Sequence, residues 1–313
     1  MILTVTLNAA MDKRYVIDSN NYNSTNRVKE IENTAGGKGL NVSRVLKLSG
    51  NDTIATGFVG GNIGNFILGE LDKEDIKNDF IKVDDESRCC INLINLSDMS
   101  QTEYLEPGFT LKSDDVMAFK AKFIKLLDQV NVVTMSGSAP KGVAKDIYKE
   151  LVEIANKKNK KVILDVSGDY LKNGILAKPY AIKPNIFELE TLVGKKINSF
   201  KELQEAANDI LNQGVEIVIV SCGKDGIYLF KKDNYMFAKA PKITLKNATG
   251  SGDSSVAGFS SGIDKGLSIE KSLRLAVAFG SANASEEKTG FVRVEIINKL
   301  LKEIEITKEN HFN

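Results

Sequence analysis

The stretch Asn247-Ala-Thr-Gly-Ser-Gly-Asp-Ser-Ser-Val-Ala-Gly258 decides the fold, because a glycine-rich turn runs there directly into small apolar residues. Gly250 and Gly252 permit tight or positive-φ backbone, so successive N–H groups can converge at the positive end of the following helix. A phosphate group fits such a place. Asp253 is either an ordinary helix cap or a base beside the bound anion, and this segment alone leaves both open.

A second glycine-rich segment, Thr34-Ala-Gly-Gly-Lys-Gly-Leu-Asn-Val-Ser43, also opens an apolar helix. Gly36 and Gly37 remove side chains so that a ligand can approach the main chain, Lys38 adds a charge, and Asn41 offers an amide. The alternative is a tight strand-to-helix turn with a solvated lysine. Neither glycine-rich segment matches the Walker or dinucleotide fingerprint, which disfavours those folds. Two such loops indicate two ligands.

Composition narrows the function classes. A chain of 313 residues can bury one large α/β core, and a net charge of +1 gives no support to nucleic-acid binding. The three cysteines, Cys89, Cys90 and Cys222, have no metal-like spacing, and the only histidine is His311. We therefore expect no disulfide framework, zinc site or Cys–His nucleophile, so acid–base chemistry falls to a carboxylate or a lysine.

The sequence gives no sign of a membrane association. No segment reaches the roughly 18 apolar residues of a spanning helix. The first residues read as a strand and lack the basic region of a signal peptide. We expect a cytoplasmic protein.

Short apolar runs alternate with amphipathic stretches along most of the chain. Such runs are typical of buried parallel strands, and the alternation predicts βαβ units in a doubly wound, mostly parallel sheet with helices on both faces. Ligands then collect at the carboxyl ends of the strands. We expect a single domain over residues 1–313. The strands are predicted at 130–135, 161–165, 180–183 and 216–221, and helices at 115–129, 144–158 and 201–213.

Two regions break this alternation, at about 11–33 and 87–107. The second contains the polar-apolar pattern Cys90-Ile-Asn-Leu-Ile-Asn-Leu96, which is typical of a half-buried strand. We expect both regions to contribute strands to one small inserted sheet.

Many of these motifs, taken in order, resemble the PfkB (ribokinase-like) family of sugar kinases, and the resemblance covers essentially all 313 residues. It is strongest to the branch that acts on ketohexose phosphates, the tagatose-6-phosphate kinases and 1-phosphofructokinases. It implies that the inserted sheet is a lid over the sugar, which in many relatives also pairs two subunits. The motifs are Thr6-Leu-Asn-Ala-Ala-Met-Asp12, Arg27, Gly36-Gly-Lys-Gly39, Ser87-Arg88, Gln101-Thr-Glu103, Ser136-Gly-Ser138, Leu164-Asp-Val-Ser-Gly168, Lys183-Pro-Asn-Ile-Phe-Glu188, Ser221-Cys-Gly-Lys-Asp-Gly226 and Gly250-Ser-Gly-Asp253.

The resemblance implies transfer of a phosphoryl group from ATP to a sugar hydroxyl. The hydroxyl must be aligned with the γ-phosphorus, its proton removed, and the charge on the phosphoryl oxygens stabilised. Asp253 is the expected base. The backbone of residues 248–252, including Gly250, Ser251 and Gly252, is the expected anion hole.

The sugar site follows from the same resemblance. Asp12 is expected to accept hydrogen bonds from sugar hydroxyls, a surface position being the alternative. A phosphorylated sugar brings a dianion, for which Arg27 and Arg88 are the candidates, because a guanidinium binds phosphate through two parallel N–H bonds. Exposed lid arginines are the alternative reading. The remaining expected sugar contacts are Gly37, Lys38, Asn41, Glu103 and Ser138.

On the nucleotide side, Asn185 and Glu188 resemble the family's Asn-x-x-Glu magnesium region, in which both act on Mg²⁺ through water. Residues Ala276–Asn283 are either a small-residue wall near the adenine or a tightly packed core helix. The residues expected to bind ATP are Lys183, Ser221, Gly223, Gly226, Thr249, Gly250, Gly252 and Asn283.

The sequence thus predicts an ATP- and Mg²⁺-dependent kinase that converts tagatose 6-phosphate to tagatose 1,6-bisphosphate. Fructose 1-phosphate is the alternative substrate. A non-catalytic sugar-phosphate sensor is a further alternative, although such a protein is free to lose Asp253. A nicotinamide dehydrogenase is disfavoured because the dinucleotide fingerprint is missing. We expect no nucleic-acid or membrane partner, and a homodimer formed through the lid sheet.

Overall fold

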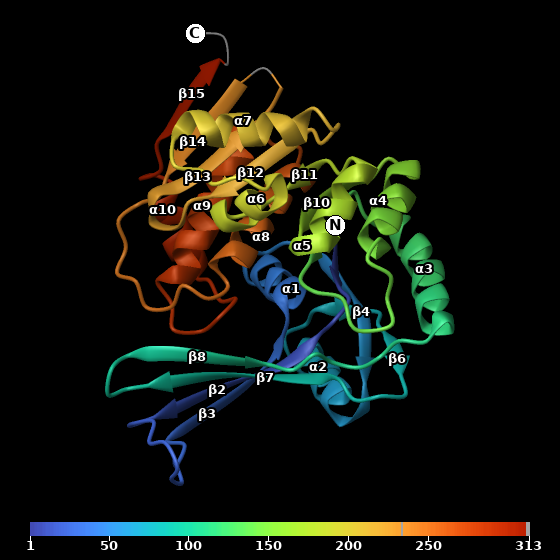
Figure 1. Cartoon of the computed structure of the whole chain (residues 1–313), viewed down its shortest axis with the longest axis vertical. Coiled ribbons are helices and arrows are strands. Elements are labelled where there is room, and N and C mark those ends of the chain that lie inside the picture. The colour runs from blue at the N-terminus through green and yellow to red at the C-terminus, as the bar shows by residue number, and fades with distance from the viewer. Residues whose placement is uncertain (233, 311–313) are drawn as a thin grey trace.

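The structure is a computed structural model that describes residues 1–232 and 234–310, so His311 lies outside the described residues. A large sheet runs through the molecule (Figure 1). Seven consecutive strands of its main path pair in parallel, and the expected doubly wound, mostly parallel sheet is confirmed. In spatial order they are β5 (Lys77–Asn78), β4 (Thr53–Gly60), β1 (Ile2–Thr6), β9 (Val132–Ser136), β10 (Lys161–Asp165), β11 (Ala181–Ile182) and β12 (Ile217–Ser221).

An antiparallel extension continues this sheet beyond β12. It consists of β13 (Gly226–Phe230), β14 (Asn234–Lys239) and β15 (Ile306–Asn310), and the short β6 (Ile81–Val83) pairs with β4 at the other side. Since antiparallel strands need only tight turns between them, the described residues between β12, β13 and β14 form no crossover helix.

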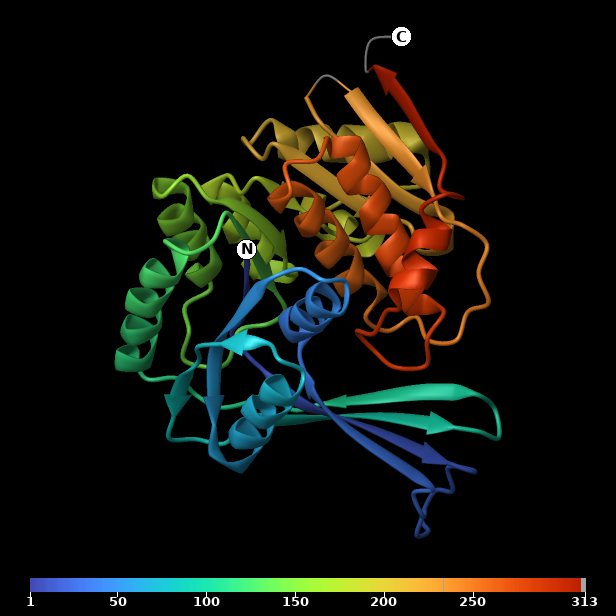
Figure 2. The same ribbon diagram turned by 180° about the vertical axis from the view of Figure 1, so that it is seen from behind.

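Helices cover both faces of the sheet because neighbouring strand residues point to opposite sides. Leu3, Val133 and Leu164 pack with one set of helices, whereas Ile2, Val132 and Ile163 pack with the other. Figure 1 looks onto the first set and Figure 2 onto the second. The first set is α3 (Ser113–Leu127), α4 (Ile147–Lys157), α5 (Gly168–Gly174), α6 (Ile186–Val193) and α7 (Phe200–Leu211); the second is α1 (Lys38–Leu48), α8 (Ser251–Asp264), α9 (Ile269–Ala284) and α10 (Val294–Leu300).

A second, four-stranded sheet projects away from this body (Figures 1 and 2). Its spatial order is β3 (Glu30–Gly36), β2 (Ala10–Ile17), β7 (Arg88–Asn95) and β8 (Ser100–Leu105), and α2 (Gly61–Lys73) packs at its base. The two chain segments expected to build a small sheet therefore do so, because β2 and β7 pair in parallel over eight residues. All six residues of β8 are exposed.

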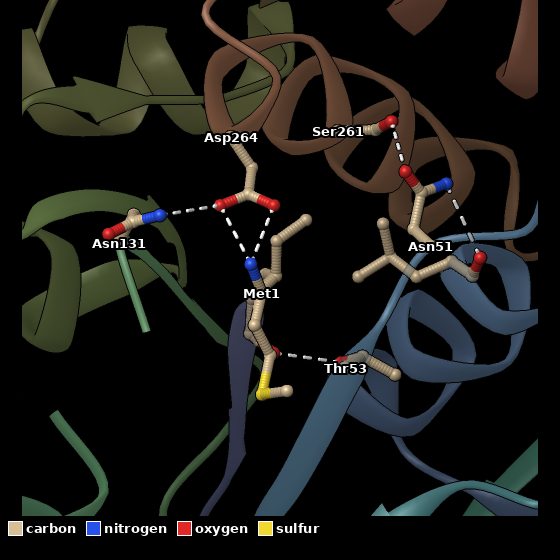
Figure 3. A network of polar contacts seen from close by, with 8 residues as sticks. Met1, Asn51, Thr53, Asn131, Ser261 and Asp264 are labelled. Atoms are coloured by element: carbon tan, nitrogen blue, oxygen red, sulfur yellow. Dashed lines mark hydrogen bonds and ion pairs between the residues drawn. The ribbon is translucent and has the colours of Figure 1, made fainter. Parts of the chain in front are cut away.

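The far end of α8 is tied to the strands. The amino group of Met1 donates to both carboxylate oxygens of Asp264, at 3.0 and 2.8 Å, and Asn131 Nδ2 donates to the same carboxylate at 3.4 Å (Figure 3). One turn earlier, Ser261 Oγ donates to Asn51 Oδ1 at 2.7 Å. These contacts lie at the amino ends of β1 and β9, so α8 runs back along the sheet and begins at the strands' carboxyl ends.

No helix in the described part of the chain is long and apolar enough to cross a membrane. The three cysteines are free thiols.

Candidate active site

A cavity of about 1740 Å³ lies where the carboxyl ends of the strands, the start of α8 and the second sheet meet. The predicted site residues that line it come from segments scattered between residues 12 and 253 of the sequence. They are Asp12, Gly37, Lys38, Asn41, Arg88, Glu103, Ser138, Lys183, Asn185, Glu188, Ser221, Gly223, Gly226, Thr249, Gly250, Ser251, Gly252 and Asp253.

The turn before α8 uses some of its own amides. Thr249 N–H donates to Asn247 Oδ1 at 2.9 Å, and Ser251 N–H donates to the carbonyl of Ala248 at 3.2 Å. These bonds fix the turn, but they remove two amides from the expected anion hole of residues 248–252.

The amides of Gly250, Gly252 and Asp253 have no intramolecular acceptor among the described residues. Gly250 has a φ of 81°, in the left-handed region that glycine adopts without strain, and it is the N-cap of α8. Free amides at the positive end of a helix bind anions. This end of α8 can therefore hold phosphoryl oxygens.

Asp253 is the buried carboxylate beside these amides. Its Oδ2 accepts a hydrogen bond of 2.8 Å from Asn41 Nδ2. Burial, together with the charge of Asp165, raises the pKa of Asp253 to about 6, against the opposing effects of Lys38, the Asn41 bond and Lys183. A carboxyl with this pKa is ionised at pH 7 and is still basic enough to take a proton from an activated hydroxyl.

Asp165, at the end of β10, organises the charges around this point. Its Oδ1 lies 3.3 Å from Lys183 Nζ and 3.9 Å from Lys38 Nζ, and the residue is 1% exposed. Burial disfavours its ionisation, but the two lysines outweigh burial and lower the pKa of Asp165. Asp165 in turn raises the pKa of Lys38 to about 12. One carboxylate thus holds two cations at the cavity. Asp165 belongs to the motif Leu164-Asp-Val-Ser-Gly168, but it was not assigned to the site from the sequence.

Asp12 lies on β2, where the second sheet joins the body. A Cβ at Gly36 would lie 2.0 Å from Asp12 Cγ, so this glycine makes room for the carboxyl rather than for a ligand. The amide of Gly37, which has a φ of 105°, donates to Asp12. Burial raises the pKa of Asp12 to about 6, against the lowering charge of Arg88. Asp12 is a hydrogen-bond acceptor on the cavity wall.

Arg88 begins β7 and is held by main-chain carbonyls. Its Nε donates to the carbonyl of Asn8 at 3.1 Å and its Nη1 donates to that of Glu106 at 3.3 Å. Asn8, which the sequence did not single out, also lines the cavity, and its Nδ2 donates to Ser138 Oγ at 3.4 Å. Arg88 is therefore a fixed cation at the junction of the two sheets.

Arg27 and Asn283 do not line the cavity of the described chain. Arg27 lies in the exposed loop between β2 and β3. Asn283 is fully buried in α9, where its Nδ2 donates to the carbonyl of Thr249 at 2.9 Å and its Oδ1 accepts from Phe291 N–H at 3.2 Å. It braces the turn before α8 instead of facing the cavity.

On the expected nucleotide side, Ser221 ends β12, Gly223 lies in the turn that follows, and Gly226 begins β13. Gly226 has a φ of 131°, and a Cβ there would lie 2.1 Å from the carbonyl oxygen of Ala238. In helix α9, Ala276, Ala278 and Ala282 pack in the core, whereas other residues line the cavity. The latter are Val277, Gly280, Ser281 and Ala284. Residues 239–243 and Leu245, which the sequence did not indicate, also line the cavity.

The donors near Asn185 fit a magnesium ion held through water. Asn185 caps α6: its Oδ1 accepts from Glu188 N–H at 2.8 Å, and Glu188 Oε2 accepts from Asn185 N–H at 3.0 Å. Glu188 Oε1 stays available on the cavity wall. Among the described residues there is no cluster of three or more metal-ligating side chains. Mg²⁺ commonly binds through one or two carboxylates, water and substrate phosphates rather than in a protein cage.

Comparison with known proteins gives consistent likenesses over the whole chain. A family model described as pfkB family carbohydrate kinase matches residues 2–295. Tagatose-6-phosphate kinase of Staphylococcus epidermidis is 41% identical over 311 residues, which are 98% of this chain and 99% of that relative. Phosphofructokinase-2 of Escherichia coli, solved in complex with potassium, has a TM-score of 0.92 at 24% identity, over 96% of this chain and 98% of its own. A possible 1-phosphofructokinase of Thermotoga maritima has a TM-score of 0.89 at 26% identity, over 99% of each chain.

Proposed function

The chain belongs to the pfkB family of carbohydrate kinases, and we propose that it phosphorylates a ketohexose phosphate with ATP, tagatose 6-phosphate being the first choice. The identity of 41% to a tagatose-6-phosphate kinase, over nearly the full length of both chains, supports this substrate. The product is then tagatose 1,6-bisphosphate.

The observation on which the reaction rests is the Asp253 carboxylate beside free amides at the start of α8. In the proposed reaction, Asp253 takes the proton of the 1-hydroxyl as this oxygen attacks the γ-phosphorus. The amides of Gly250, Gly252 and Asp253 bind the oxygens of the transferred phosphoryl group, over which its negative charge is spread while ADP leaves with the electron pair of the broken bond. Donors already fixed by the turn need no reorganisation during the transfer.

The lysines beside Asp165 supply positive charge on either side of this point. We assign Lys183 to the nucleotide phosphates, because a Cβ at Gly252 would lie 3.4 Å from Lys183 Nζ. Lys38 follows the loop that adjoins Asp12, so it belongs to the sugar side. Their fixed positions favour an in-line approach of the two substrates.

At the other end of the substrate, Asp12 accepts hydrogen bonds from sugar hydroxyls, and the guanidinium of Arg88 binds the 6-phosphate. The two side chains lie close enough for the charge of Arg88 to lower the pKa of Asp12. Arg27 does not line the cavity of the described chain. In this proposal it binds the phosphate only if its loop moves or if a second subunit brings it to the cavity.

Mg²⁺ is part of the proposal. Glu188 and Asn185 would hold the ion through water at the ATP phosphates. When bound, the ion neutralises phosphate charge and orients the γ-phosphoryl group.

Fructose 1-phosphate is the second candidate, favoured by the likeness to the possible 1-phosphofructokinase of Thermotoga maritima. Its acceptor is the 6-hydroxyl, so the same cavity would bind a phosphate at carbon 1. Both candidates present one phosphate and one primary hydroxyl at opposite ends of a ketohexose.

We also propose a homodimer through the second sheet, in the cytoplasm where sugar phosphates and ATP are made. Ile31, Tyr104 and Leu105 of this sheet are 63%, 55% and 65% exposed, which is high for apolar side chains. Light scattering on the purified protein tests the assembly: a monomer at micromolar concentration contradicts it. Charged replacements of Ile31 and Tyr104 should dissociate the dimer.

The function is tested by ADP formation from ATP and Mg²⁺ with a panel of phosphosugars. We expect the highest kcat/KM with tagatose 6-phosphate. A higher value with fructose 1-phosphate would favour the second candidate. No ADP formation with any ketohexose phosphate would contradict the proposal.

A further inference from the structure

Arg44 is a buried cation to which the proposed reaction gives no role. It lies on α1 and is 7% exposed. Its Nε donates to Glu74 Oε1 at 2.7 Å, its Nη2 donates to the carbonyl of Ala35 at 2.6 Å, and its Nη1 donates to Asn41 Oδ1 at 3.3 Å. Because all three guanidinium nitrogens have acceptors, the side chain is fixed in one orientation.

The contact to Asn41 determines which way that amide points. Residues 41 and 44 are three apart on one helix and so share a face. An ionised carboxylate only accepts hydrogen bonds and a guanidinium only donates them. The amide between Asp253 and Arg44 satisfies both only with Nδ2 toward Asp253 and Oδ1 toward Arg44. The opposite orientation would set oxygen against oxygen and donor against donor.

The loop after α9 packs against the same amide. Gly290 has a φ of 63°, and a Cβ there would lie 2.9 Å from Asn41 Oδ1. Asn283 holds this loop by accepting from Phe291 N–H. Gly290 thus confines the amide of Asn41, and Arg44 orients it.

We infer that Arg44 is a positioning residue for phosphoryl transfer: through Asn41 it holds Asp253 Oδ2, so that Oδ1 is the oxygen that accepts the proton of the sugar hydroxyl. This inference rests on the proposed function, in which Asp253 is the base. Glu74, at the end of α2, belongs to the same chain of contacts because it holds Arg44.

Charged groups from several elements shift the pKa of Asp253. They are Asp165 from β10, Lys38 from α1 and Lys183 after β11, and the neutral amide of Asn41 completes the set. The bond from Asn41 favours the ionised carboxylate. Its loss therefore raises the pKa of Asp253 and moves the acid limb of the pH profile to higher pH. Arg44 affects the acid limb because it orients the Asn41 amide that donates to Asp253.

The test compares Arg44→Met with Lys47→Met in the purified full-length kinase, by kcat and KM between pH 5 and 9. Lys47 is the matched control, since it lies one turn further along α1, and its Nζ pairs with the exposed Asp75 at 2.5 Å. With Arg44→Met we expect kcat to fall about tenfold, the size of one lost hydrogen bond. We also expect the acid limb of kcat to move upward, with KM for ATP little changed. Lys47→Met should match the wild type.

A double variant separates the route through Asn41 from a direct electrostatic one. The charge of Arg44 also lowers the pKa of Asp12, which is a second way to shift a pH profile. If the amide transmits the effect, Arg44→Met changes neither kcat nor the acid limb in an Asn41→Ala background. If the losses of kcat from the two substitutions add in the double variant, the inference is overturned. It is also overturned if the acid limb of kcat in Arg44→Met alone stays where it is in the wild type.

Arg44→Lys keeps the inference testable if Arg44→Met does not fold. Lysine retains the charge and most of the volume, but one ammonium cannot reach three acceptors in the planar guanidinium arrangement. We expect the same upward shift of the acid limb, and an unshifted limb would overturn the inference. Asp253→Asn is measured in the same series. Full activity of that variant would refute the base itself, whereas an inactive Asp253→Asn beside a normal Arg44→Lys would refute the role of Arg44 alone.

Discussion

Asn41 Nδ2 donates a hydrogen bond of 2.8 Å to Asp253 Oδ2 across 212 residues of sequence, and this bond joins the two glycine-rich helix starts into one site. The sequence assigned Asn41 to the sugar. In the structure its amide, on the cavity wall, donates to the Asp253 carboxylate, so α1 contacts the proposed base.

The first prediction concerns pH. Burial raises the pKa of both Asp253 and Asp12 to about 6. A base must be ionised to accept a proton, so kcat/KM should be constant above pH 7 and fall as the pH decreases through about 6. The measurement is kcat/KM for tagatose 6-phosphate between pH 4.5 and 9. A profile that stays flat down to pH 4.5 would contradict the assignment.

The second prediction concerns stability. The pKa of Asp253 is higher in the folded than in the unfolded chain, so this carboxyl favours folding when protonated and disfavours it when ionised. A difference of about two pH units corresponds to roughly 3 kcal/mol. Asp253→Asn should therefore raise the free energy of unfolding at pH 8, and this gain should shrink as the pH falls from 6 to 4. Urea titrations at several pH values measure it, and an equal or lower stability at pH 8 is the contrary result.

The third prediction concerns Asp165, the carboxylate that pairs with both Lys38 and Lys183. Asp165→Asn removes a negative charge that raises the pKa of Asp253, so the acid limb of kcat/KM should move to lower pH. It also leaves buried Lys183 without its ion pair, which typically destabilises a protein by about 3–5 kcal/mol. Activity profiles and urea unfolding at pH 7 report the two effects. An acid limb that moves upward would show that Asp165 acts in another way.

The fold and the candidate site differ in how much of each could be predicted from the sequence. Apolar runs placed β9, β10 and β12 within about two residues, because buried parallel strands are short and continuous in their hydrophobicity. The break in alternation at 11–33 and 87–107 identified the second sheet, although not that β2 and β7 pair in parallel. The antiparallel extension β13–β15 was not predicted, since β15 joins from far along the chain.

In the site, the two glycine-rich loops were visible because their residue types need special backbone. The roles of Asp165 and Arg44 were not, since each depends on partners brought together by packing. Asn283 shows the converse: its type and position fitted a ligand contact, but its amide is used to brace the turn before α8.

The fourth prediction concerns the substrate phosphate. Arg88→Ala should reduce kcat/KM far more for tagatose 6-phosphate than for tagatose, because only the former carries the dianion that Arg88 would bind. The loss of a charge-assisted hydrogen bond commonly costs about 1.5–3 kcal/mol, or roughly 10- to 150-fold. Steady-state kinetics on both sugars measures this difference. Equal losses on the two would mean that Arg88 only holds the junction of the two sheets.

The most direct measurement is the rate of phosphoryl transfer by Asp253→Asn, with tagatose 6-phosphate and saturating ATP and Mg²⁺ at pH 8. The amide preserves the shape of the side chain and removes the base, so binding of both substrates, followed by calorimetry, should stay close to wild type. The transfer rate should fall by ~10²–10⁴-fold, the usual contribution of a positioned general base. A rate within about threefold of the wild type, with binding intact, would contradict the assignment of Asp253.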